Sequence, residues 1–120
     1  MSEKAQVKHF KALNHFFISR DRDYFLENVS MLIISGMGVL EAIDAVLVDV
    51  KSKKMQRIII EIREDVAAGS AFWKALAEVQ LFPDHVLSLL RIGEESGKLA
   101  DNLKIISLNQ EKERLFRSKI

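Results

Sequence analysis

The chain has 120 residues, of which 48% are hydrophobic and 29% are charged, as is ordinary for one folded globular domain with a modest core. A net charge of +1 does not mark it as a nucleic-acid binder, and the lack of cysteine excludes disulfides, thiolate nucleophiles and cysteine-based zinc sites. The longest stretch without a charged residue, 28–40, is shorter than the roughly 20 residues of a membrane span, and no signal peptide is visible.

The N-terminal segment, residues 1–20, is predicted to be helical or flexible. Between residues 4 and 18, apolar residues recur at helical spacing, and the opposite face is basic. The favoured interpretation is a terminal helix that covers a little core, and the alternative is a helix lying on a partner or on anionic lipid. The two faces consist of Val7, Phe10, Leu13 and Phe17, and of Lys4, Lys8, His9, Lys11 and His15.

Hydrophobic periodicity over residues 21–118 predicts an all-α fold, a compact bundle of about six antiparallel helices joined by short turns. No alternating run typical of a strand competes with this interpretation. The predicted helices cover residues 22–35, 39–50, 52–68, 71–79 and 83–97, and a sixth begins near residue 98. Residues expected to face the core include Phe25, Val29, Leu32, Ile43, Leu47, Met55, Ile59, Ile62, Phe72, Leu76, Val86, Leu87, Leu90, Leu99, Leu103 and Ile106.

Polar residues and one proline mark the expected helix starts. The first confident helix has Asp21 or Asp23 as its N-cap, because a short polar side chain can accept bonds from the free N–H groups of the first turn. Ser52 is the expected cap of the third helix and Ser70 that of the fourth. Pro83 begins the fifth helix, since proline suits the first helical turn and its predecessor is pushed out of helical geometry.

Glycines mark the expected helix ends. Gly36, Gly69 and Gly97 follow the first, third and fifth helices, and glycine adopts the left-handed conformation that closes a helix at no steric cost. We therefore expect Gly97→Val to destabilise the domain, because a β-branched residue does not readily adopt a positive φ.

The sequence contains no recognisable catalytic motif. The five glycines form neither a Walker nor a dinucleotide-binding pattern, and no Gly-x-Ser-x-Gly elbow is present. His9 and His15 are six residues apart, which separates them by about 120° around a helix. His85 forms no dyad with the adjacent Asp84, so surface imidazoles are favoured. We expect no catalytic residue, no cofactor and no enzymatic activity.

Glu94 and Glu95 break a local rule. Both lie in the last turn of a predicted helix, where the macrodipole disfavours a carboxylate. Three interpretations stay open: they face the start of the next helix, they contact a partner's basic residue, or they help to bind a hard cation with Asp84 or Asp101. If a partner contact is correct, Glu94→Lys should impair assembly and leave the domain folded, because it removes the dipole conflict.

Four markers, in order and in register, resemble the cytoplasmic F domain of the inner-membrane platform proteins of type II secretion systems and type IV pili. They are the helix-turn at 32–39, the Val-x-x-Gly-Ser turn at 66–72, the Phe-Pro pair at 82–83, and Gly-Glu-x-Ser-Gly-x-Leu at 93–99. Trp73 departs from the family, which often has a smaller residue there. The motif residues are Gly36, Gly69, Phe82, Pro83, Gly93, Ser96, Gly97 and Leu99.

The resemblance implies a non-enzymatic scaffold on the cytoplasmic face of the bacterial inner membrane. Its partners would be the cytoplasmic motor ATPase and the inner-membrane assembly proteins, with a homodimer also possible and no nucleic acid. The domain would be the N-terminal copy of two, and we expect the natural protein to continue past residue 120 into a membrane span. Pilus and secretion versions share these markers, although the short N-terminal extension slightly favours the pilus.

Two other classes of function stay open. One is a stand-alone helical adaptor without a membrane link. The other is a small regulatory domain that binds a cation such as calcium.

Overall fold

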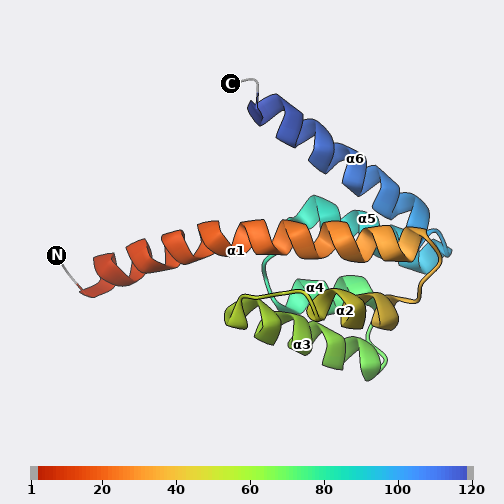
Figure 1. The fold of residues 1–120 in the computed structure, drawn as a ribbon, viewed down its shortest axis with the longest axis horizontal. Coiled ribbons are helices and arrows are strands. Elements are labelled where there is room, and N and C mark those ends of the chain that lie inside the picture. Colours follow the sequence, from red (N-terminus) through yellow and green to blue (C-terminus); the bar gives the residue numbers. More distant parts are fainter. Residues whose placement is uncertain (1–2, 119–120) are drawn as a thin grey trace.

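The computed structural model describes the backbone of residues 3–118 and the side chains of residues 19–118. All regular structure in this part of the chain is helical, which confirms the predicted all-α fold (Figure 1). The six helices are α1 (Glu3–Ile34), α2 (Val39–Leu47), α3 (Lys53–Ala67), α4 (Phe72–Glu78), α5 (Asp84–Ser96) and α6 (Leu99–Ser118).

The helices form a closed ring around one core. Each helix contacts the next one in the chain, and α6 returns to contact α1. In Figure 1, α2, α3 and α4 lie on one side of α1, α5 passes behind α1, and α6 extends on the other side. The radius of gyration is 15.3 Å, against about 14 Å for a compact domain of this length. The excess arises because the N-terminal half of α1 and the C-terminal half of α6 project from the ring.

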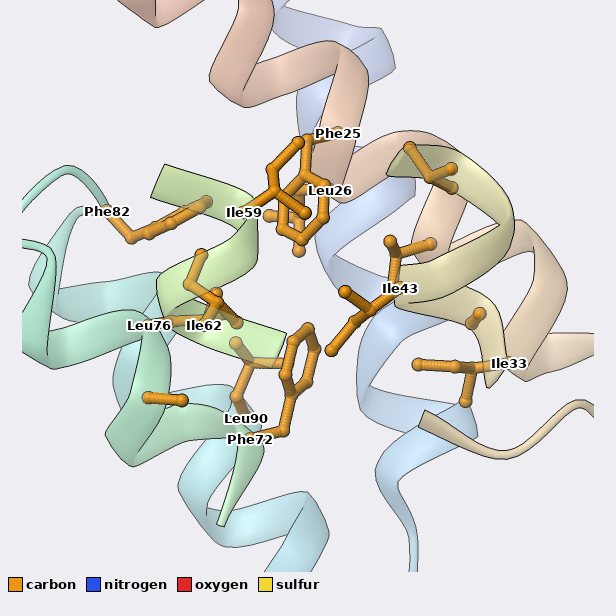
Figure 2. Packing of buried hydrophobic residues seen from close by; sticks show 14 of the residues in the cluster. Phe25, Leu26, Ile33, Ile43, Ile59, Ile62, Phe72, Leu76, Phe82 and Leu90 are labelled. Atoms are coloured by element: carbon orange, nitrogen blue, oxygen red, sulfur yellow. The ribbon is translucent and has the colours of Figure 1, made fainter. Parts of the chain in front are cut away.

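The core draws on all six helices, and Figure 2 shows side chains from α1 to α5 converging on one space. The predicted apolar stripes are confirmed at most positions. Of the residues expected in the core, Leu32, Leu47, Leu87 and Leu99 are only half-buried at its edge. The buried hydrophobic residues are Phe25, Leu26, Val29, Ile33, Ala42, Ile43, Val46, Val50, Met55, Ile59, Ile62, Phe72, Ala75, Leu76, Phe82, Val86, Leu90, Leu103 and Ile106.

The first helix differs from its prediction. The expected N-cap at Asp21 or Asp23 is wrong, because α1 runs without a break from Glu3 to Ile34. The predicted boundary between residues 20 and 21 therefore falls inside a helix. Asp23 instead accepts a hydrogen bond from Arg22 at 3.1 Å, on the outside of the helix. An aspartate that could cap the start of a helix does not interrupt a longer helix when no glycine or proline lies nearby.

Two further boundaries need correction. α2 ends at Leu47 rather than Val50, because the chain tightens into a turn in which Asp49 and Val50 donate N–H bonds to Val46 and Leu47. Ser70 does not cap α4; the N-cap position belongs to Ala71, whose side chain makes no capping bond. The cap by Ser52 is confirmed, since its side-chain oxygen accepts a bond from the Met55 N–H at 3.2 Å.

The glycine-closed turns are confirmed. Gly36, Gly69 and Gly97 have φ values of 108°, 104° and 73°, a region that is strained for residues with a Cβ atom. α1 and α6 are the longest helices, but none of the helices within residues 3–118 is long and apolar enough to cross a bilayer.

Candidate functional site

Glu94 joins two helices that are distant in sequence. Its side chain leaves α5 and accepts two backbone hydrogen bonds at the start of α4. Phe72 N–H donates to Oε2 at 2.9 Å, and Trp73 N–H donates to Oε1 at 2.6 Å. The carboxylate therefore satisfies two of the free N–H groups of α4 and lies at the positive end of that helix's dipole. We call this arrangement the Glu94 brace.

The Glu94 brace resolves the broken local rule in a way that the sequence did not predict. The interpretation in which Glu94 and Glu95 face the start of the next helix, α6, is wrong for Glu94, which caps α4 instead. The expected tolerance of Glu94→Lys is reversed as well, because a lysine would leave two N–H groups unpaired beside a like partial charge. Both carboxylate oxygens of Glu94 are engaged inside the domain.

Gly93 sits where α5 and α6 approach most closely. A Cβ atom at this position would lie 3.0 Å from the Leu99 Cα and 3.2 Å from the Asn102 Cβ, so tight that these neighbours would have to move by a few tenths of an ångström. Asn102 Nδ2 also donates to the Leu89 carbonyl at 2.7 Å, across the same contact. The motif thus places its first glycine inside a helix for close packing, whereas the sequence suggested only a role at the turn.

The rest of the motif closes α5. Ser96 Oγ donates to the Ile92 carbonyl at 2.7 Å. Gly97 adopts the left-handed conformation, and Lys98 N–H bonds back to the Gly93 carbonyl at 2.7 Å. This double closure turns the chain sharply, so that α6 begins at Leu99 and packs back on α5.

Glu95 lies on the outside of the same turn, beside an aromatic ring. Arg91 Nε donates to Glu95 Oε1 at 3.0 Å, and both side chains are exposed. The Arg91 guanidinium also lies over the Trp73 ring, 4.9 Å from its centroid, in a cation–π arrangement. We call Trp73, Arg91 and Glu95 the α4–α5 patch. The sequence indicated its glutamate, but not the tryptophan and arginine that lie beside it.

The Phe82–Pro83 pair anchors the start of α5. Phe82 is buried in the core, and Pro83 occupies the N-cap with φ of −64°. The preceding carbonyl, that of Leu81, accepts a bond from Arg22 Nη1 at 2.9 Å, which ties this loop to α1. The pair therefore has a structural role here.

The candidate cation ligands do not converge on the glutamates. Asp84 and Asp101 lie in the first turns of α5 and α6, whereas Glu94 and Glu95 lie in the last turn of α5. Among the described residues, no group of three His, Asp or Glu side chains is arranged to hold a metal ion.

His85 is exposed, and it lines a hollow of about 160 Å³ between α1, the start of α5, and α6. Arg22 and Asp23 from α1 and Glu113 and Arg117 from α6 also line this hollow, where cations and carboxylates alternate. His9 and His15 lie outside the residues whose side chains are described.

An ion pair between α2 and α3 was not indicated by the sequence. The Arg63 guanidinium donates to both carboxylate oxygens of Asp44. The hydrogen bond that Arg63 donates to Asp44, and secondly the negative charge of Asp44, raise the pKa of Arg63 above its ordinary value. The pair links α2 to α3, in a part of the molecule that is separate from the motif at residues 93–99.

The closed six-helix ring, the glycine-closed α5–α6 hairpin and the Glu94 brace together define the class of this protein, a small all-α domain whose motif residues hold its helices together. The family model described as "Type II secretion system (T2SS), protein F" matches residues 25–120, and the chain belongs to this family. This match confirms the resemblance found in the sequence.

The relatives include components of both kinds of machine. The chain is 30% identical over 101 residues to the type IV pilus assembly protein PilC of Thermus thermophilus, covering 84% of this chain and 25% of the relative. It is 31% identical over 88 residues to the type II secretion system protein F of Vibrio cholerae, covering 72% of this chain and 21% of the relative. The chain thus spans about a quarter or less of the length of these relatives.

Proposed function

We propose that this domain is a non-enzymatic scaffold of the inner-membrane platform protein in a type IV pilus or type II secretion machine. It lies on the cytoplasmic face and couples the motor ATPase to the assembly of pilin or pseudopilin subunits. Family membership over residues 25–120 is the observation on which this proposal rests. The relatives' names, which include pilus assembly and type II secretion proteins, support the choice of machine.

The α4–α5 patch is the surface that we assign to a partner. Tryptophan and arginine are enriched among the residues that dominate protein interfaces. Trp73 and Arg91 lie together here, and Glu95 adds an exposed carboxylate. The Glu94 brace holds the α4 backbone at Trp73 against α5, so the patch is fixed before a partner binds. Of the two candidate glutamates, Glu95 is the exposed one that can meet a partner together with Arg91, and Glu94 positions the patch.

A pull-down between this chain and the motor ATPase of the same machine tests the proposal. Arg91→Glu and Glu95→Lys each reverse one charge of the patch and should lower ATPase capture at least about tenfold, the loss expected for a contact in an interface centre. Glu61→Lys, a charge reversal at an exposed position on α3, is the matched control and should bind normally.

Circular dichroism should show all three variants folded, since the altered side chains are exposed. Capture that is equal for the wild type, the patch variants and the control would refute the patch. No capture of the wild type by the ATPase would refute the direct coupling and favour a stand-alone helical adaptor.

A further inference from the structure

Charge is distributed unevenly along the chain. Residues 1–18 and 111–120 together hold seven Lys or Arg residues and three Asp or Glu residues, a net charge of +4. Residues 19–110 hold eleven Lys or Arg residues and fourteen Asp or Glu residues, a net charge of −3. The net charge of the whole chain, +1, conceals this separation of a basic part from an acidic part.

Residues 3–18 and 111–118 of the basic part lie in the two projecting helix ends. In Figure 1, the N-terminal half of α1 extends from one end of the ring, and the C-terminal half of α6 rises from the side opposite α2 and α3. A flat surface laid across both tips in this view leaves the acidic ring entirely on one side. Positive charge in excess is therefore concentrated toward two separate points of the fold, although on α6 Arg114 contacts Glu27 of α1 at 3.3 Å and Arg117 lies 4.0 Å from Glu113.

The projecting part of α6 also exposes large apolar side chains. Every residue from 111 to 118 is exposed, and among them Leu115 and Phe116 are 56% and 68% exposed. Leu108, about two turns before them, is 57% exposed. At 100° per residue, these three side chains and Lys112 fall within an arc of about 100° on the helix surface.

We propose that the two projecting helix ends bind the surface of an anionic lipid bilayer, with Leu115 and Phe116 entering the headgroup region. Helices that lie in this interface combine exposed Phe and Leu side chains with Lys and Arg that meet anionic headgroups. A net charge of +3 on residues 3–18 and 111–118 complements such a surface, and the net charge of −3 on residues 19–110 disfavours its approach by the ring. The contact orients the ring and its α4–α5 patch relative to the bilayer.

Co-sedimentation of the 120-residue chain with lipid vesicles tests the proposal. Vesicles of equal parts phosphatidylglycerol and phosphatidylcholine should bind the chain at low ionic strength, and vesicles of phosphatidylcholine alone should not. High salt should release the protein, because the attraction is screened within a Debye length.

Charge variants locate the electrostatic contact. Replacing Lys4, Lys8 and Lys11 together by glutamine should weaken partitioning about 100-fold, since each cation near the surface contributes about one factor of five. The matched control replaces three exposed lysines of the ring, at positions 51, 53 and 54, by glutamine. This control removes the same charge and should change partitioning little. Equal losses in both triple variants would overturn the proposal, because net charge alone would then explain the binding.

An apolar variant locates the inserted side chains. Phe116→Ser should weaken partitioning about tenfold, whereas Val48→Ser, at an 82% exposed position between α2 and α3, should have no effect. Undiminished binding of Phe116→Ser would overturn the insertion. Light scattering without lipid measures the oligomeric state. A dimer that Phe116→Ser dissociates would overturn the proposal and assign this face to a second copy of the chain.

Vesicle binding is measured with purified chain and lipid alone, without ATPase or pilin. Failure to bind vesicles would therefore leave the coupling role intact, and failure to capture the ATPase would leave the lipid contact intact.

Discussion

The starts of α3 and α4 solve the same problem in different ways. α3 is capped by Ser52, three residues before the N–H group that it binds. α4 has no side-chain cap of its own and is capped by Glu94, which lies 22 residues beyond Phe72 in the sequence. The first cap forms with the helix itself, but the second exists only after α4 and α5 have packed together. A local cap stabilises one helix, whereas the Glu94 brace makes two helices depend on each other.

Glu94→Lys tests this dependence most severely. We expect a loss of about 3 kcal/mol in the free energy of unfolding, because two half-buried N–H groups lose their acceptor and face a positive charge. Urea denaturation would measure the loss. Hydrogen exchange should speed up at the Phe72 and Trp73 amides, and Glu95→Lys, one residue away and exposed, is the control. Unchanged exchange at these two amides would contradict the brace.

Gly97→Val should cost about 2 kcal/mol, because φ of 73° forces a β-branched side chain into left-handed geometry. The loss should spread over the α5–α6 hairpin, since this glycine sets the direction in which α6 leaves. Thermal denaturation would measure it. Gly97→Asn, which tolerates a positive φ better, should recover most of the stability, and equal costs for both replacements would argue against backbone strain.

Ser52→Ala should cost about 1 kcal/mol, the usual value for a lost N-cap. Its effect should stay local: exchange should speed up at the Met55 amide and remain unchanged at Phe72 and Trp73. A peptide of residues 50–68 should lose helix content with the same replacement, because this cap does not need the rest of the fold. Circular dichroism of the two peptides would decide this point.

Ser70→Ala should have the smallest effect, below about 0.5 kcal/mol, since Ser70 is exposed and is not the cap of α4. It is the direct counterpart of Ser52→Ala, because both serines look alike as helix starts in the sequence. A cost near that of Ser52→Ala would mean that Ser70 caps α4 in solution.

What the sequence predicted follows the same division between local and distant interactions. The apolar stripes, Gly36, Gly69, Gly97 and the Ser52 cap depend on neighbours within a few residues, and the structure confirms them. The unbroken α1 was missed because an aspartate that could cap a helix is tolerated equally well on the surface of one.

The partner of Glu94 was missed for another reason. The helix dipole disfavours a carboxylate at Glu94, as the sequence indicated. The N–H groups that compensate it belong to α4, which only tertiary packing places beside it. The crossing at Gly93 and the stacking of Arg91 on Trp73 are of the same kind, since both depend on which helices become neighbours. The motif residues could thus be found from the sequence, but their individual roles could not.

The close contact at Gly93 holds α6 near its first turn, so a small change of the α5–α6 crossing angle there displaces the far end of α6 by a larger distance. Phe116 lies about 26 Å along the helix from Leu99, at a rise of 1.5 Å per residue. A tilt of about 10° at the crossing would therefore move Phe116 by roughly 4 to 5 Å over that length. Such a tilt would also separate Arg114 from Glu27, whose 3.3 Å contact joins the outer part of α6 to α1. Side chains of increasing size at position 93 would push α6 away from α5 and change the crossing angle of the two helices by increasing amounts.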